Sequence, residues 1–270
     1  MFREKLDKTD ARKLNIGLMP YLNSVLFYRS MPPDKFNLVA LPPRPMTRAA
    51  AEGKLDAGPI PVVGGMTLER DFEPLGDFCI ATKDKARSIL LFSRVRIEEL
   101  SGEKVGVTDE TSTSEQLLKV LLTRKFNLRN ISYVSLESPN DAYLLIGDGA
   151  LKNRRGVQGY PYIYDLGEIW NSWTGLSFVF AVWIVRKSLP KEQKDAMSAA
   201  IQASLNLRRD YKRFVVDRPG LNMSEDDVRE YLEGFNFVMG EQEYKALKLF
   251  KSYLSVSLGS PERQSLRSLP

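Results

Sequence analysis

Histidine is missing from this sequence of 270 residues, and cysteine occurs once, as Cys79. A Ser-His-Asp triad, a Cys-His pair and a zinc site with histidine ligands all require histidine, so none of them can form in this chain. A single cysteine also excludes a disulfide framework and a metal site built from several thiolates. Any catalysis must therefore come from carboxylates, lysine, tyrosine, hydroxyl groups, backbone dipoles or the substrate itself.

Long apolar runs are missing as well. No stretch approaches the roughly 18 uninterrupted apolar residues of a membrane-spanning helix, so we expect no contact with a membrane. The first 17 residues, MFREKLDKTDARKLNIG, are polar and contain no apolar signal segment, which predicts a cytoplasmic protein.

A strong excess of charge of one sign is the third absence. The 39 basic and 34 acidic residues are spread along the chain and give a net charge of +5. The nearest basic clusters, KNRRG at 152–156 and LRRDYKR at 207–213, have the composition of solvated loops or helix faces. We therefore expect no nucleic-acid partner, whereas a small anionic ligand suits a mildly basic protein.

What the sequence does contain is an alternation of short apolar strands with helical stretches. This pattern predicts an α/β fold with mostly parallel sheets. A second strand–helix unit near Lys104 repeats the first one near Leu14, which favours two lobes with a cleft between them. We expect residues 1–95 and 182–270 to form the first lobe and residues 96–181 the second. The predicted elements are strands at 15–20, 36–42, 55–63, 88–94, 102–108, 131–136, 142–148 and 178–188 and helices at 24–31, 45–54, 109–126 and from 191 onward.

Ligands of open α/β sheets bind beyond the carboxyl ends of the strands, which directs attention to the residues at those ends. In the first lobe, PYLNS places Tyr21 and Asn23 after the first strand, either as a helix cap or as part of a ligand site. Ile60 lies in GPIP at the end of the third strand, as a candidate cleft wall. Arg87 and Ser88 open the strand SILLF and are candidates for an anion contact.

The second lobe offers hydroxyl groups at its first helix. Thr111, Ser112, Thr113 and Ser114 follow one another before a periodic helix. Ser112 and Glu115 have the spacing of a capping box, and a helix start of this kind can also bind a carboxylate or phosphate.

Two further strand or turn positions complete the candidate site. Gly147 and Asp148 end the strand in LIGDGA, where Gly147 permits a close backbone approach and Asp148 can bind a hydroxyl, accept a proton or cap a helix. Thr174 lies at the turn before the long apolar strand. Most of the aromatic residues in WNSWTGLSFVFAVW, by contrast, have the pattern of core residues.

Taken in order, the strings YLNS, GKLDAGPIP, RSILLFS, TSTSEQLLKVLL, LLIGDGAL and YDLGEIWNSWTGLSFVFAVW resemble the chorismate dehydratase family of the futalosine route to menaquinone. The resemblance runs from about Leu14 to Tyr253. It implies a type II periplasmic-binding-protein fold with two α/β lobes. It also implies a cytoplasmic lyase that removes water from chorismate, with no metal and no organic cofactor.

Within this resemblance, individual residues take roles by motif. Asn23 matches the key cleft asparagine of YLN, and Ser88 matches the serine of the SVLLFS-like strand. The resemblance thus implies Asn23 and Ser88 as catalytic residues. Thr113, Ser114, Gly147 and Asp148 match the TS and IGD motifs and are implied to bind substrate.

The sequence departs from the family pattern at three places near the expected cleft. Pro20 stands where the family usually has serine before YLN. IPVVGG, which includes Val62 to Gly65, replaces a motif that usually begins IPS. TKDKA at 82–86, which includes Lys83 to Ala86, replaces an SDGPV-like loop.

Three functions on this scaffold remain to be compared. The first is chorismate dehydratase, which the YDLGE-x-W and TGL-x-FVFA strings favour. The second is the sister enzyme that forms a dihydroxynaphthoate later in the same route, and the third is a non-catalytic protein that binds a small carboxylate. The partner in each case is a small anionic molecule, and we expect a monomer or a homodimer. The sequence singles out no general base, and a substrate carboxylate is one candidate.

Overall fold

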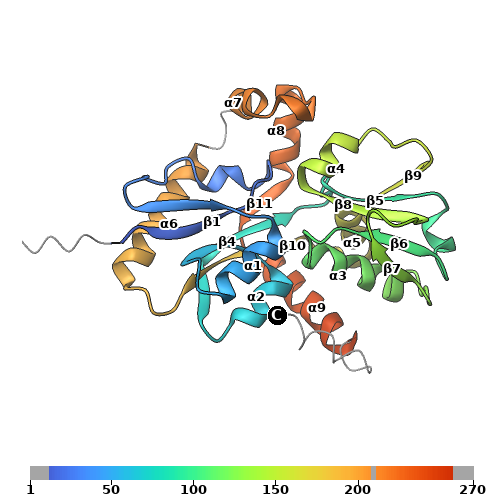
Figure 1. Ribbon diagram of the computed structural model, residues 1–270, viewed down its shortest axis with the longest axis horizontal. Coiled ribbons are helices and arrows are strands. Elements are labelled where there is room, and N and C mark those ends of the chain that lie inside the picture. The colour runs from blue at the N-terminus through green and yellow to red at the C-terminus, as the bar shows by residue number, and fades with distance from the viewer. Residues whose placement is uncertain (1–11, 208–210, 258–270) are drawn as a thin grey trace, which may run out of the picture.

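The computed structural model describes residues 12–207 and 211–257, and within these ranges it consists of two β-sheets with helices packed around them (Figure 1). The first sheet has the strand order β11-β4-β10-β3-β1-β2, and the second has the order β7-β6-β8-β5-β9. We call the parts of the chain around these sheets the first and second lobes. The predicted α/β architecture with two lobes is confirmed.

Three parallel strands form one half of the first sheet. β1 (Leu14–Leu18) pairs in parallel with β2 (Phe36–Ala40) on one side and with β3 (Ala57–Pro61) on the other. β10 (Phe178–Arg186) runs antiparallel to β3 and to β4 (Phe72–Thr82), and β11 (Phe235–Val238) lies outside β4. Every residue of β3 is buried, as expected for a strand covered on both faces.

The second sheet is also mixed. β6 (Lys104–Val107) pairs in parallel with β7 (Ser132–Ser135) and β8 (Ala142–Ile146). β5 (Ile89–Ser93) runs antiparallel to β8 and to β9 (Tyr162–Asp165). The carboxyl ends of β1 and β3 in the first sheet and of β8 in the second sheet reach the space between the lobes.

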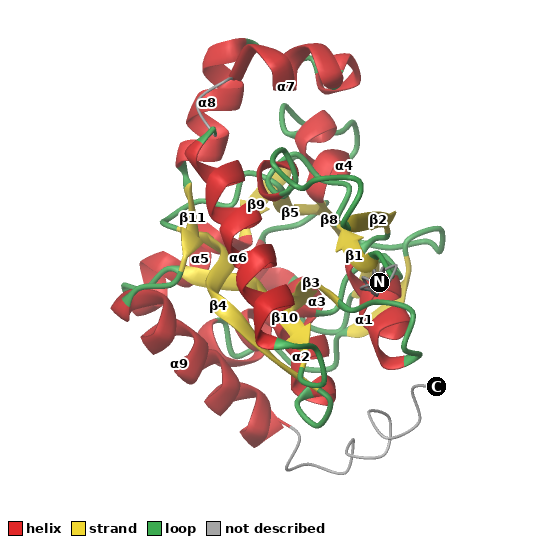
Figure 2. Ribbon diagram, turned by 90° about the vertical axis from the view of Figure 1, so that its left-hand side faces the viewer, coloured by secondary structure: helices red, strands yellow, loops and turns green. Residues whose placement is uncertain are grey.

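Helices cover the faces of both sheets (Figures 1 and 2). The last helix, α9 (Glu241–Ser257), contacts β10 of the first sheet and α3 (Thr113–Val120) of the second lobe. One apolar core lies within the first lobe, and a second core extends from the second lobe through Cys79 and Phe178 to Phe250 of α9. The other helical segments are α1 (Pro43–Ala51), α2 (Val62–Leu68), α4 (Gly147–Asn153), α5 (Leu166–Thr174), α6 (Lys191–Asn206), α7 (Tyr211–Asp217), α8 (Glu225–Glu233), the 3-10 turns η1 (Val25–Phe27), η2 (Ile97–Glu99) and η4 (Pro219–Leu221), and the π-helical turn η3 (Leu121–Lys125).

The chain crosses between the lobes at points that differ from the expected boundaries at 95/96 and 181/182. β5 belongs to the second sheet, so the first crossing lies between β4 and β5, at 83–88. β10 belongs to the first sheet from Phe178 onward, so the return crossing follows α5 at 175–177. Arg87 in the first crossing has a φ of 58°, a conformation that non-glycine residues rarely adopt. The Asp165 carboxylate accepts hydrogen bonds from the backbone N–H groups of Ala86 (3.0 Å) and Arg87 (2.5 Å), which holds this crossing in place.

Several local predictions are wrong. The stretch after PYLNS forms only the 3-10 turn η1 and not an α-helix, and α3 begins at Thr113 and not at Asp109. The strands β4, β9 and β11 were not predicted. None of the helices in the described part of the chain is long and apolar enough to span a membrane.

Candidate functional site

A small cavity lies between the two lobes, at the strand ends singled out from the sequence. The carboxyl ends of β1, β3 and β8 reach it, together with the segment after β6. The space open to the centres of water-sized molecules is about 40 Å³, which holds roughly three waters. Its lining residues are Met19, Tyr21, Asn23, Pro43, Pro61, Ile80, Ile89, Thr111, Thr113, Ile146, Gly147, Phe180 and Ala181.

Asn23 brings an unpaired amide group to this cavity. Its side chain is 7% exposed, and its Oδ1 has no hydrogen-bond partner among the described residues. A cap on η1 does not account for it, because the N-cap residue is Ser24 and makes no side-chain cap bond. The Ser24 hydroxyl lies instead 2.5 Å from the Met19 carbonyl and 3.0 Å from the Tyr21 carbonyl, and so closes the turn beneath Asn23. Asn23 therefore does not act as the cap of η1.

Tyr21 connects this turn to the second lobe. Its hydroxyl donates a hydrogen bond to Glu110 Oε2 at 2.9 Å. Burial and the neighbouring Glu110 raise the pKa of Tyr21 well above its usual value, so the hydroxyl keeps its proton at neutral pH. Its ring lies against Gly147, where an added Cβ would come within 2.5 Å of the ring. Gly147 also has a φ of 56°, so both the close approach and the backbone conformation require glycine here.

Asp148 contacts the turn and does not line the cavity. Its Oδ1 accepts a hydrogen bond from the backbone N–H of Leu22 at 2.9 Å, and its Oδ2 pairs with Arg218. Of the two residues predicted to bind substrate here, Gly147 lines the cavity, whereas Asp148 connects the second lobe to the first.

The hydroxyl-rich segment at the start of α3 also divides. Thr111 and Thr113 line the cavity, but Ser112 and Ser114 do not. The predicted capping box is wrong, because Ser112 makes no side-chain cap bond and Glu115 pairs with Arg44 and Lys119. Ser112 Oγ is a second buried oxygen without a partner among the described residues, and Thr113 Oγ1 accepts a hydrogen bond from the Val63 N–H at 3.2 Å.

Four other predicted site residues lie outside the cavity lining. Ser88 is completely buried and accepts a hydrogen bond from the Tyr231 hydroxyl at 2.8 Å, while its own hydroxyl lies 3.2 Å from the Ala86 carbonyl. Arg87 pairs with Glu230 on α8. Ile60 is buried in β3 beside the lining residue Pro61, and the Thr174 hydroxyl donates to the Trp170 carbonyl at the end of α5. A direct contact of these residues with a ligand would need a rearrangement of the site.

Sequence reasoning missed the part of the cavity lining that comes from β4 and β10, and it missed one contact between the lobes, made by Arg44. The lining residues from these two strands are Ile80 of β4 and Phe180 and Ala181 of β10. Arg44, at the start of α1, donates to the Thr111 carbonyl at 3.0 Å through Nε and pairs with Glu115 at 2.6 Å. The apolar string FVFAVW indicated a core strand, and nothing in it marks Phe180 as a cavity residue.

Within residues 12–207 and 211–257 no charged side chain lines the cavity, so a bound carboxylate would be held by hydroxyl, amide and backbone N–H groups. The start of α3 carries the positive end of the helix dipole and faces this space through Thr113. Among the described residues, no group of three or more Cys, Asp or Glu side chains is placed to hold a metal ion.

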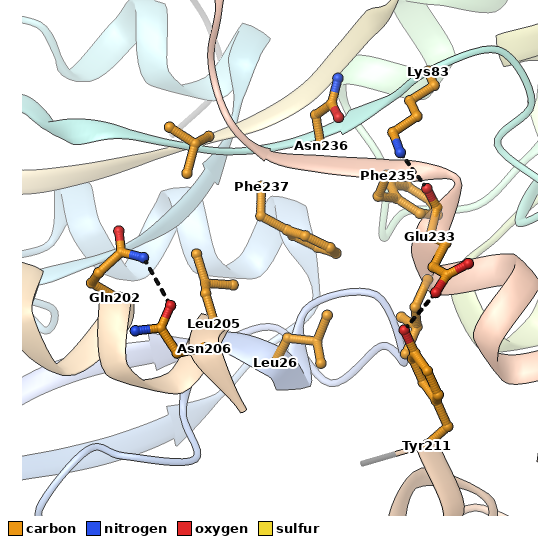
Figure 3. A pocket seen from close by; sticks show the side chains of 12 residues that line it. Leu26, Lys83, Gln202, Leu205, Asn206, Tyr211, Glu233, Phe235, Asn236 and Phe237 are labelled. Atoms are coloured by element: carbon orange, nitrogen blue, oxygen red, sulfur yellow. Dashed lines mark hydrogen bonds between the residues drawn. The ribbon is translucent and has the colours of Figure 1, made fainter. Parts of the chain in front are cut away.

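A larger groove of about 750 Å³ lies elsewhere on the first lobe, between α6 and β11 (Figure 3). Its polar groups bond to one another: Lys83 Nζ donates to the Glu233 carbonyl at 2.7 Å, and the Tyr211 hydroxyl donates to Glu233 Oε1 at 2.9 Å. None of the predicted site residues lines it, so the inter-lobe cavity remains the candidate site.

Comparison with known proteins agrees with this geometry. Over 262 residues, the chain is 25% identical to a chorismate dehydratase of Thermus thermophilus, covering 89% of this chain and 95% of that protein. A crystal structure of an Archaeoglobus fulgidus protein is similar with a TM-score of 0.74 and 15% identity, covering 91% of this chain and 97% of that one. The periplasmic aliphatic sulphonate binding protein of Escherichia coli is similar with a TM-score of 0.63 and 14% identity, covering 92% and 93%. These likenesses confirm the periplasmic-binding-protein-like fold.

A sequence model described as menaquinone biosynthesis matches residues 14–255, which is most of the chain. The chain therefore belongs to the menaquinone biosynthesis family.

Proposed function

We propose that the protein is a cytoplasmic hydro-lyase that removes water from chorismate and yields 3-[(1-carboxyvinyl)oxy]benzoate. Membership of the menaquinone biosynthesis family and the likeness to a chorismate dehydratase support this reaction. The observation that carries the proposal is Asn23, which lines the inter-lobe cavity and whose buried amide oxygen has no hydrogen-bond partner in the described structure. Buried polar groups normally find partners, so an orphaned one on a cavity-lining residue fits a ligand contact made when the site is filled.

The reaction needs few catalytic groups from the protein. A proton leaves the ring carbon that carries the enolpyruvyl ether, the electron pair of that C–H bond becomes part of the new aromatic ring, and the neighbouring hydroxyl leaves with a proton as water. Aromatisation supplies the driving force, so holding the dianion and orienting one hydroxyl are the main tasks. In this proposal the Asn23 amide contacts the leaving hydroxyl, and the N–H and hydroxyl groups at the start of α3 hold a carboxylate.

Closure of the lobes is part of the proposal. A cavity of about 40 Å³ is too small for chorismate, so substrate enters when the lobes separate at the two crossings, 83–88 and 175–177. Closing the lobes around substrate then excludes water and strengthens each polar contact. The general base in this scheme is a carboxylate of the substrate, because among the described residues no ionisable side chain lines the cavity except the protonated Tyr21.

A non-catalytic binding protein is the second candidate, favoured by the mainly apolar lining and the lack of charged residues in it. The decisive experiment incubates the purified protein with chorismate and follows an aromatic product by chromatography and absorbance. A product with the mass of chorismate less one water supports the dehydratase. Tight binding in calorimetry without product supports the binding protein. Neither binding nor product, with turnover of a cyclised futalosine derivative, supports the dihydroxynaphthoate-forming enzyme.

A further inference from the structure

One ion pair holds the turn that carries Asn23. Arg218 Nη1 donates to the Pro20 carbonyl at 3.0 Å and pairs with Asp148 Oδ2. Asp148 Oδ1 accepts the hydrogen bond from the Leu22 N–H at 2.9 Å. The backbone carbonyl before Tyr21 and the backbone N–H after it are therefore both fixed, and Asn23 is the next residue along the chain.

The two partners of this pair come from distant parts of the molecule. Asp148 lies in the first turn of α4 in the second lobe, whereas Arg218 lies in the first lobe between α7 and η4. Figures 1 and 2 show α7 and α4 on the same side of the molecule, away from α9. The first lobe therefore supplies Arg218 and the second lobe supplies Asp148. The Pro20 carbonyl and the Leu22 N–H are both hydrogen-bonded only when the two lobes are together.

The surroundings make this pair stronger than one on the surface. The side chains of Arg218 and Asp148 are 21% and 23% exposed, so they are partly shielded from water, which screens exposed pairs. Asp148 also lies near the positive end of the α4 dipole. Phe214 of α7 and Tyr28 beside η1 line the same open pocket of about 420 Å³ as Arg218.

We propose that Arg218 is a positioning residue. Through the Pro20 carbonyl and Asp148, it sets the orientation of the Pro20–Asn23 turn and hence of the Asn23 amide in the cavity. The activity part of its test rests on the proposed function, whereas the orientation of Asn23 does not.

The first measurement is kinetic. Arg218→Met is expected to lower kcat for chorismate by about 100-fold, since a misplacement of about 1 Å costs this much, with a change in KM of less than about threefold. Arg218→Lys is expected to recover part of the loss, because an ammonium group can still reach one of the two acceptors. The matched control is Arg213→Met: Arg213 is exposed on α7 and its ion pair among the described residues is with Asp217 of the same helix, so the kcat of this variant is expected to stay at the wild-type value.

The second measurement needs no substrate. With 15N-asparagine labelling, the Asn23 side-chain amide is assigned by its loss in Asn23→Ala. We expect one set of amide resonances in the wild type and in Arg213→Met, and shifted or multiple resonances in Arg218→Met. If Arg218→Met does not fold, Arg218→Lys and Asp148→Asn serve for the same comparison.

The outcomes separate the two proposals. Displaced Asn23 resonances together with a lower kcat support the positioning role. Displaced resonances in a protein whose wild type makes no product overturn the proposed reaction and leave the positioning role standing. Unchanged Asn23 resonances in Arg218→Met overturn the positioning role, whatever happens to kcat.

Discussion

The buried Asn23 amide oxygen destabilises the folded protein, because no contact within the described structure satisfies it. Leaving a buried acceptor unpaired costs about 1–3 kcal/mol, and Asn23 Oδ1 is such an acceptor in the described structure. Its neighbour Ser24 shows the opposite case, because its hydroxyl is engaged with two carbonyls of the turn. Of these two adjacent side chains, Ser24 is bonded within the turn, whereas Asn23 keeps an acceptor that the proposed function assigns to the substrate.

Replacing Asn23 by alanine is expected to separate these two quantities. Asn23→Ala should lower kcat for chorismate by about 100-fold or more, by analogy with the removal of one transition-state hydrogen bond. Its free energy of unfolding should stay within about 1 kcal/mol of the wild-type value, since no protein hydrogen bond is lost. Steady-state kinetics and urea unfolding measure the two. Asn37→Ala is the control, because Asn37 is an exposed asparagine on β2, and wild-type turnover in Asn23→Ala would contradict the role of Asn23.

Two glycines on one helix allow a matched comparison. Gly147→Ala places a methyl group within 2.5 Å of the Tyr21 ring at a positive φ, and the backbone conformation alone costs about 1–2 kcal/mol. Gly149→Ala meets nothing within 4 Å on the same helix, so its stability should be unchanged or raised by up to about 1 kcal/mol. Thermal unfolding and turnover are the measurements. Equal behaviour of the two variants would show that the contact between Tyr21 and Gly147 does not matter.

At the scale of elements, the parallel strands could be predicted because each is a short, mainly apolar stretch with its own boundaries. β4 could not be predicted, because Pro74, Gly76 and Asp77 interrupt its alternation and its place depends on pairing with β10 far along the chain. Ser88 shows the same limit for a side chain. Its motif predicted it at the start of a strand, but β5 begins one residue later, at Ile89, and the Ser88 hydroxyl accepts a hydrogen bond from Tyr231, 143 residues away. Sequence patterns locate strand ends well, but they do not tell which side chains at those ends are already engaged.

One buried carboxylate ties α9 to β11 and to the second crossing between the lobes. Glu243 accepts hydrogen bonds from Ser177 Oγ at 2.8 Å, Asn236 Nδ2 at 2.7 Å and the Gly240 N–H at 2.9 Å. Burial by itself raises the pKa of Glu243, but these hydrogen bonds outweigh it and hold the pKa below its usual value. The carboxylate therefore joins β11 and α9 to the end of the second crossing, directly before β10.

A pH dependence follows from this lowered pKa. The folded protein binds the Glu243 proton less tightly than the unfolded chain, so the stabilisation is complete above the usual pKa of 4.5 and is lost as the pH falls through the lower folded value. Glu243→Gln should therefore be less stable than the wild type at pH 7, by about 1–3 kcal/mol, and this difference should shrink as the pH falls below about 4.5. Urea unfolding of both proteins at pH 7 and pH 4 measures it. A difference that grows on acidification would mean that Glu243 is not held as the carboxylate.

At the scale of the whole molecule, the small cavity and the contacts around it correspond to the closed state of the proposed mechanism. Arg44 closes one side by joining α1 to the segment before α3, and the ion pair of Arg218 with Asp148 closes another. Opening must break such contacts, so their strength sets the balance between open and closed lobes.

Removing the Arg44 contacts between the lobes should shift the equilibrium toward the open state. Arg44→Met removes the bonds to the Thr111 carbonyl and to Glu115, and a loss of about 1.4 kcal/mol would raise the ratio of open to closed protein about tenfold. Small-angle scattering of the ligand-free protein should then give a larger radius of gyration than for the wild type. Arg48→Met, an exposed arginine on the same helix, should leave the radius unchanged. Saturating chorismate should restore the wild-type radius in Arg44→Met, and a radius that never differs from wild type would contradict this role of Arg44.

The order of strands along the chain has a consequence for synthesis. All strands of the second sheet, β5 to β9, lie in one continuous stretch, whereas the first sheet needs β10 between β3 and β4 and β11 at its edge. During translation the second lobe is therefore complete first, while the strands of the first lobe wait for partners made much later. The turn at Pro20–Asn23 is made early, whereas Arg218, which bonds to its first carbonyl, lies 198 residues later in the chain. We therefore expect the candidate site to mature only after most of the chain has been made.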